Sequence, residues 1–361
     1  MNIKIKKVNI INYLFFVVAL FFCPALCSSA WAQIPTQTPS EPTDSVSGQQ
    51  VFCGSSVTGA CLWAETDVSA EEIRVFDSSL SRLARTLPGF SLLPSRWNLW
   101  LSNHWWASAG YWSPTQMLSD GSPYLLLRRG TFQAERGAIR ILAHELTHLI
   151  QYRLQPHAED WIREGMALLS EYRMLRVPPS SIFAAQVSSA VQLTGPLSLE
   201  LEGAEAALSG LSMIQLQPRY GAIFLYFHYV DRVCFSGTLL ETLLAPGART
   251  DAEFGLSEWD SFLRLNSSHA LCRNGFRSSF RAFARARFAP DLSRPDGSVW
   301  TFSSLPAVSS SEQLAALPAR AIYAATSNAQ GSRCARGEEY LPASFASAAA
   351  RCLRIHFPEN R

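Results

Sequence analysis

Residues 135–153 read ERGAIRILAHELTHLIQYR, and residues 160–176 read DWIREGMALLSEYRMLR. Neither stretch contains a proline, and apolar residues recur in both at the spacing of one helical face. Pro156 follows the first stretch and Pro178 follows the second, and proline commonly marks the end of a helix. The sequence therefore predicts two consecutive helices joined by a short turn, which would pack antiparallel to each other.

The first of these helices carries His144, Glu145 and His148 in the pattern H-E-x-x-H. Residues four apart lie about one turn apart on one face, so the two imidazoles can bind one zinc ion at about 2.0–2.1 Å. Glu145 is rotated by about 100° from His144, which places its carboxylate beside the metal. There it can deprotonate a zinc-bound water, whose pKa the metal lowers to about 7. The alternative is an ordinary amphipathic helix with two partly buried histidines.

A catalytic zinc needs a third protein ligand and one open position. The arrangement with a histidine six residues after the second one is excluded, because Leu154 stands there. His157 follows a proline in the turn, where an exposed side chain is expected. Glu164 on the second helix is the best candidate. The small residues Gly165 and Ala167 beside it are expected to let the second helix pack closely on the first.

The segments HELTH and WIREGMALLSEY resemble the gluzincins, the thermolysin-like and aminopeptidase-like metallopeptidases with H-E-x-x-H followed by Glu in E-G-x-A. The similarity is greatest to the peptidase-MA-like and hyicolysin-type secreted members. It covers about residues 135–176, and residues 215–245 weakly. The resemblance implies His144, His148 and Glu164 as zinc ligands and Glu145 as the catalytic base. Leu169 departs from the pattern, because many members carry a tyrosine there.

Members of this clan often use a tyrosine or histidine downstream of the third ligand to stabilise the oxyanion. Tyr220, near the start of a predicted helix, resembles that tyrosine, and His228 is the second candidate. Packing in an aromatic core is an equally weighted alternative. Glu171 and Asp160 are candidates for orienting the ligand histidines, although an exposed position is the favoured interpretation for both.

Residues 1–32 are predicted to be a signal peptide. Lys4, Lys6 and Lys7 precede an apolar run, and Ala30-Trp31-Ala32 forms a cleavage pattern; an uncleaved anchor is the alternative. Residues 33–50, rich in Pro, Ser and Thr, read as a flexible leader. The sequence therefore predicts an exported protein, periplasmic or extracellular, with no transmembrane segment after cleavage.

Eight cysteines fall to six once the predicted signal peptide is removed. An even number in an exported protein favours disulfides, and six cysteines allow 15 connectivities. Pairing between sequence neighbours is the preferred set: Cys53–Cys61, Cys234–Cys272 and Cys334–Cys352. A thiolate from Cys53 or Cys61 bound to a metal is the alternative.

The charge pattern gives no case for nucleic-acid binding. The chain's three lysines lie in the predicted signal peptide, and the remaining 28 of 31 cationic residues face 29 acidic ones. Arginines recur at every fourth position from Arg273 to Arg285, and residues 273–287 contain no acid. The spacing of these arginines predicts one basic helix face. A contact of this face with an anionic surface is one interpretation, and a solvated helix face is the favoured one.

Five tryptophans between Trp97 and Trp112 are expected to pack in the core rather than to bind carbohydrate or lipid. Residues 96–103 and 124–128 are predicted strands. The second is either the sheet edge that aligns a peptide substrate or, with equal weight, an ordinary strand of the sheet. A helix is predicted over 69–87, with Ser69 and Glu72 as its capping box.

The predicted fold class is α+β and zincin-like, with a small twisted sheet packed on the active-site helix and a helical subdomain after it. One metallopeptidase-like domain is expected over 51–361. Its strand-containing part spans about 51–134, its active-site helices 135–176, and its helical and loop-rich part 177–361. Helices are expected at about 219–233, 257–265 and 274–288, with loops and short helices from residue 289.

The predicted function is that of a zinc-dependent peptidase acting on protein or peptide substrates, with Zn²⁺ as its cofactor. Two alternatives stay open: a surface-binding protein such as an adhesin with a structural zinc, and a zinc hydrolase of cell-wall peptides.

Overall fold

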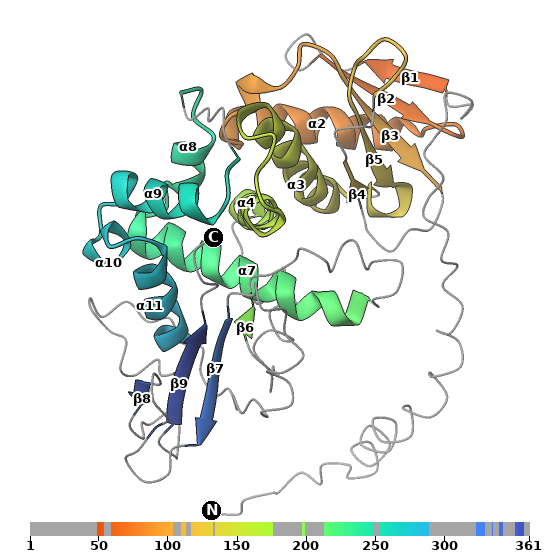
Figure 1. Ribbon diagram of the computed structural model, residues 1–361. Helices are drawn as coiled ribbons and strands as arrows, with labels where there is room; N and C mark the ends of the chain where they lie inside the picture. The colour runs from red at the N-terminus through yellow and green to blue at the C-terminus, as the bar shows by residue number, and fades with distance from the viewer. Residues whose placement is uncertain are drawn as a thin grey trace, which may run out of the picture. The chain divides into compact units, whose positions relative to one another are not determined.

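The chain is described by a computed structural model with mixed α and β structure (Figure 1). The predicted signal peptide and most of the predicted leader lie outside the described residues, and the first strand begins at Gln49. The described residues are 49–53, 59–103, 110–112, 117–132, 134–175, 197–198, 213–247, 253–288, 323–328, 334, 339–341 and 351–356.

The N-terminal part forms a five-stranded mixed sheet in the order β1-β2-β3-β5-β4. Strands β2, β3 and β5 run parallel, whereas β1 and β4 pair antiparallel with β2 and β5. Both predicted strands are confirmed as β3 and β5. The strands are β1 (Gln49–Cys53), β2 (Ala60–Ala64), β3 (Trp97–Ser102), β4 (Gly110–Tyr111) and β5 (Tyr124–Arg128).

Strand β5 is an interior strand, so the alternative of an ordinary sheet strand is confirmed for residues 124–128 and the edge alternative is wrong. Gly110 of β4 pairs opposite Leu127, and β4 is therefore the edge on this side of the sheet, with β1 at the opposite edge. Strand β4 could not be predicted from the sequence, because it pairs over two residues only and one of them is glycine, which is depleted in strands.

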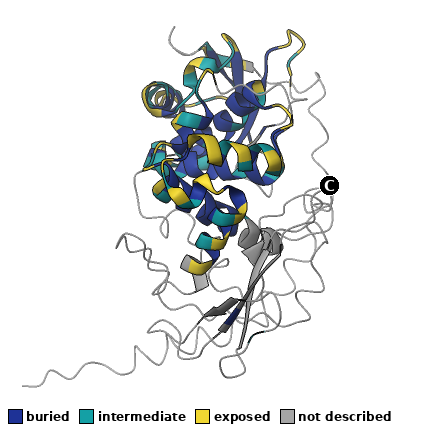
Figure 2. Cartoon of the chain, turned by 60° about the vertical axis from the view of Figure 1, so that its left-hand side comes forward, coloured by how far each residue is buried: buried dark blue, intermediate teal, exposed yellow. Residues whose placement is uncertain are grey.

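One face of this sheet packs against helices α2 and α3 in the main core of buried side chains (Figure 2). Trp97, Trp100 and Trp112 are buried, which confirms the expected core role for these three. Trp105 and Trp106 lie outside the described residues.

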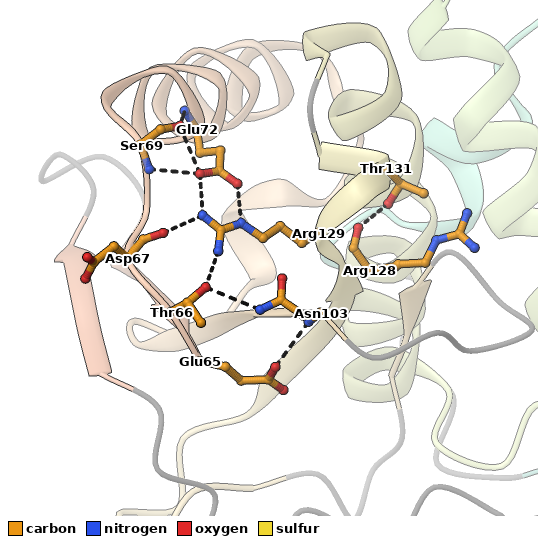
Figure 3. Close-up of polar contacts among 9 residues, drawn as sticks. All are labelled: Glu65, Thr66, Asp67, Ser69, Glu72, Asn103, Arg128, Arg129 and Thr131. Atoms are coloured by element: carbon orange, nitrogen blue, oxygen red, sulfur yellow. Dashed lines mark hydrogen bonds and ion pairs between the residues drawn. The ribbon is translucent and has the colours of Figure 1, made fainter.

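Helix α2 (Ala70–Thr86) begins at the predicted capping box, in which the side chain of Ser69 accepts from the backbone of Glu72 and the Glu72 carboxylate accepts in return. Arg129, directly after β5, donates to both oxygens of Glu72 and to the carbonyl of Asp67 (Figure 3). The contact with Arg129 lowers the pKa of Glu72 to about 2. This cluster ties the start of α2 to the carboxyl end of the parallel strands.

The two predicted helices of residues 135–176 are confirmed as α3 (Glu135–Leu154) and α4 (Asp160–Leu175). They pack on each other as a helical hairpin. The buried Thr147 hydroxyl donates to the Ser170 hydroxyl across the contact, at 2.8 Å. Because α3 also packs on the sheet, the hairpin joins the N-terminal layer to the helices that follow (Figure 1).

A helical part follows, in which α7 packs against α4. The three helices expected here are confirmed, although α7 begins earlier than expected and a short helix precedes α11. The helices are α7 (Met213–Cys234), α8 (Leu239–Leu243), α9 (Leu256–Asn266), α10 (Ala270–Arg273) and α11 (Phe276–Phe288).

Gly165 serves a different contact from the one expected. A Cβ atom on Gly165 would lie 2.2 Å from two ring atoms of Phe227 in α7, so glycine lets α7, rather than α3, approach α4. Neighbouring residues of a helix differ in direction by about 100°. Glu164 can therefore face α3 while Gly165 faces α7.

The expectation of loops and short helices after residue 289 is wrong, because residues 323–356 contribute three strands to a second sheet. Its order is β6-β7-β9-β8, and all its pairs are antiparallel. Residue 197 pairs with residue 324. The two lie so far apart in the sequence that local sequence patterns do not reveal their pairing. The strands are β6 (Leu197–Ser198), β7 (Tyr323–Asn328), β8 (Glu339–Leu341) and β9 (Arg351–His356).

All three expected disulfides are present, and the metal-bound thiolate is thereby excluded for Cys53 and Cys61. One bond joins β1 to β2, one joins the end of α7 to α10, and one joins a residue before β8 to β9. The bonds are Cys53–Cys61, Cys234–Cys272 and Cys334–Cys352.

Helix α11 is amphipathic, with its described arginines exposed and its first three phenylalanines buried. A contact between these arginines and an anionic surface stays a prediction. Within the described ranges, no helix combines the length and the hydropathy that a membrane crossing requires.

The Gly165 contact gives a first prediction. Gly165→Ala is expected to lower the free energy of unfolding by about 1–3 kcal/mol, because the added methyl group collides with the Phe227 ring. Gly130→Ala is the control, since a Cβ there meets nothing within 4 Å. Urea unfolding measures both variants, and equal midpoints would contradict the packing of α4 on α7.

Candidate metal centre

Three side chains converge between α3 and α4. The Nε2 atoms of His144 and His148 lie 3.1 Å apart, and each lies 3.4 Å from a different oxygen of the Glu164 carboxylate. In the described part of the chain, no other group of three or more His, Cys, Asp or Glu side chains is close enough to hold a metal ion. The structure thus brings together the three ligands expected from the sequence.

The spacing of these atoms fits a tetrahedral zinc site. Bonds of about 2.0–2.1 Å at tetrahedral angles separate the ligand atoms by about 3.3 Å. The two Nε2 atoms are 3.1 Å apart, and one oxygen of Glu164 lies within 4.8 Å of both. Two imidazoles and one carboxylate are also the ligand set of thermolysin-type catalytic zinc. His144, His148 and Glu164 could therefore hold a metal ion, and their chemistry suits Zn²⁺.

Glu145 is buried beside this group, with 5% of its surface exposed, and does not belong to it. A Cβ atom on Gly110 would lie 2.8 Å from Oε1 of Glu145, so the edge strand β4 passes directly against this carboxylate. Burial raises the pKa of Glu145 to about 7; His144 opposes the shift, and the carboxylates of Glu164 and Glu171 add to it.

Glu171 orients one of the candidate ligands. Nδ1 of His144 donates to Oε1 of Glu171 at 2.7 Å, which leaves Nε2 of His144 to face Glu164 and His148. Nε of Arg140 donates to the other oxygen of Glu171 at 2.6 Å. Glu171 is buried, with 5% of its surface exposed, so the favoured interpretation of this residue as a surface charge is wrong.

The pKa values of the two histidines shift in opposite directions. Burial lowers the pKa of His148 to about 3, so its ring is neutral near pH 7 and its nitrogen can bind a metal. Burial also disfavours the charged form of His144, but its hydrogen bonds to Glu164 and Glu171 outweigh burial and raise its pKa. For Glu164 the neighbouring histidines and Arg163 outweigh burial and lower the pKa to about 2.

The remaining candidates have varied positions. Tyr220 in α7 is half-buried against the core, and its role as oxyanion donor stays a prediction. His228 is buried with its ring 4.5 Å from that of Tyr172, as the aromatic-core interpretation expects. His157 is exposed, and Asp160 pairs with Arg163 on its own helix.

Sequence reasoning missed Arg140 and Gly110. Arg140 precedes His144 by four residues, and that spacing puts both on one face of α3, so a signal was available. Gly110 gave none, because its place beside Glu145 depends on how β4 pairs with β5.

No protein-family model matches the chain, and a search of curated proteins finds no significant match. The resemblance to the gluzincins therefore stays an expectation from the sequence motif.

Glu145 gives a second prediction, for the metal-free protein. Its pKa is 4.5 ordinarily and about 7 when folded, so the folded state favours the neutral acid. Stability is therefore lost as pH rises from about 4.5 to 7, by about 3 kcal/mol in total. Glu145→Gln removes this loss, and is expected to stabilise the protein at pH 8 and to have little effect at pH 5.

Urea unfolding of the chelator-treated protein at both pH values measures this difference. Glu253→Gln, at an exposed glutamate, is the matched control and should change neither midpoint. A stabilisation of Glu145→Gln that is equal at pH 5 and pH 8 would contradict the raised pKa.

Proposed function

We propose that this protein is an exported zinc metallopeptidase of the gluzincin type, which hydrolyses peptide bonds in protein or peptide substrates. One observation carries the proposal. Three candidate ligand side chains converge, and the buried carboxylate of Glu145 lies next to them without belonging to the group. Structural zinc sites are almost always closed by four protein ligands, whereas catalytic sites keep one position open. Three ligand groups among the described residues therefore favour a catalytic site.

His144, His148 and Glu164 would hold the zinc ion. When bound, zinc supplies a Lewis acid that polarises the scissile carbonyl and makes water more acidic. Glu145 accepts the proton of the attacking water and returns it to the leaving amine. In the metal-free protein, burial raises the pKa of Glu145 towards neutral pH, the direction expected for a group that exchanges a proton there. Tyr220 is the proposed donor to the oxyanion.

Strand β4 supports a peptide as the substrate. An extended peptide can add to the edge of a sheet through main-chain hydrogen bonds, and β4 is the one of the two edge strands that lies against Glu145. Because Gly110 has no side chain and lies against Glu145, a peptide paired with β4 would pass close to the proposed general base.

Export is supported by two independent features. The three disulfides fit an oxidising compartment, and the basic and apolar segment of residues 1–32 has the pattern of a signal peptide.

Glu145→Gln tests the proposed chemistry. Loss of a general base is expected to reduce peptide hydrolysis by about 10²–10⁴-fold, while zinc stays bound because Glu145 is no ligand. A peptide library digested with and without chelator measures activity, and metal analysis measures zinc. An adhesin with a structural zinc would keep its biological activity in this variant, and a cell-wall hydrolase would cleave cell-wall peptides in preference to the library.

Glu164→Ala tests the ligand set. Loss of one of three protein ligands is expected to lower zinc affinity steeply and to bring the bound zinc below one ion per chain. Glu253→Ala is the control at an exposed position. Unchanged stoichiometry and affinity would exclude Glu164 as the third ligand.

A further inference from the structure

We propose that Arg140 is a positioning residue of the metal centre and that it acts on His144 through Glu171. The inference deepens the proposed function and rests on it in one respect, namely that the His144, His148 and Glu164 side chains bind zinc.

Arg140 and His144 stand one turn apart on α3 and donate to the same carboxylate from α4. Arg140 binds Oε2 of Glu171 at 2.6 Å, and His144 binds Oε1 at 2.7 Å. Each oxygen therefore has its own donor, and the two contacts together fix the carboxylate in its plane. A single contact with His144 would leave that carboxylate able to rotate about its own axis.

The orientation matters because Glu171 directs the His144 ring. A carboxylate on Nδ1 of a histidine sets the tautomer and the ring plane, and thus the direction in which Nε2 points. The proposed metal position lies on that Nε2 side, where His148 is 3.1 Å away. If Glu171 shifts, the His144 nitrogen shifts with it.

Charge gives an independent reason for a cation at Arg140. Glu145, Glu164 and Glu171 bring three carboxylates to this site, of which Glu145 and Glu171 are each 5% exposed. Buried charges need compensating partners. Arg140 supplies a positive charge to Glu171 through their contact, and Arg163 acts in the same sense on Glu164.

A purely structural role makes a different prediction. If Arg140 only ties α3 to α4, its loss lowers stability equally with and without zinc and leaves zinc affinity unchanged. If it positions Glu171, its loss weakens zinc binding in a folded protein. Substitutions of residues that orient a metal ligand typically cost 10–100-fold in metal affinity.

The experiment measures zinc affinity of the full chain by competition with a chromophoric chelator. Arg140→Gln is expected to weaken zinc binding by about 10–100-fold, and Arg140→Lys, which keeps the charge, by less. Arg136→Gln is the matched control, one turn earlier on α3 and exposed, and should leave zinc affinity unchanged. Far-UV circular dichroism of the metal-free variants reports folding.

A double-mutant cycle tests whether the effect passes through Glu171. In a Glu171→Gln background, adding Arg140→Gln is expected to weaken zinc binding no further. Wild-type affinity in Arg140→Gln, or fully additive losses in the double variant, would overturn the inference. If Arg140→Gln does not fold, Arg140→Lys decides: reduced affinity supports the inference and wild-type affinity overturns it.

These outcomes separate the inference from the proposed function. Reduced zinc affinity in Arg140→Gln without any peptidase activity in the wild type would support the positioning role and contradict the peptidase. An active zinc enzyme with unchanged affinity in Arg140→Gln would do the reverse. Absence of zinc binding by the wild type would overturn both.

Discussion

The structure depends on how negative charge is accommodated between α3 and α4. Glu145, Glu164 and Glu171 lie close together in a largely buried site, and charges are costly to bury without partners. The contacts around them supply those partners. His144 bridges Glu164 and Glu171, and Arg140 binds the far oxygen of Glu171. The proposed metal ion would add further positive charge beside these carboxylates. Metal binding would therefore also contribute to the electrostatic stability of the hairpin.

The helical hairpin can hold these buried charges in place because both of its helices are packed against other elements. Helix α3 packs on the mixed sheet and α4 packs on α7, where the absence of a side chain at Gly165 admits the Phe227 ring. Thr147 and Ser170 join the two helices between these contacts. A site on packed helices keeps its geometry better than one on loops, which suits a centre whose ligand atoms must stay within tenths of an ångström.

The neighbours of two adjacent buried carboxylates shift their pKa values in opposite directions. Glu164 faces the histidines, and its pKa is lowered to about 2, whereas Glu145 faces β4, and burial raises its pKa to about 7. One carboxylate is therefore suited to bind a cation and the other to exchange a proton. Their environments, rather than their residue type, divide the work.

The sequence by itself determined what depends on short spacings. The four-residue interval in HELTH put His144 and His148 on one helical face, and the proline-bounded turn brought Glu164 to them. The pairing of cysteines that are neighbours in the sequence was also predicted, although Cys234 and Cys272 are 38 residues apart. Tertiary structure alone decided the burial of Glu171, the place of Gly110 beside Glu145, and the second sheet. Each depends on which neighbour a side chain or strand meets across the fold, and helical or strand periodicity carries no information about that neighbour.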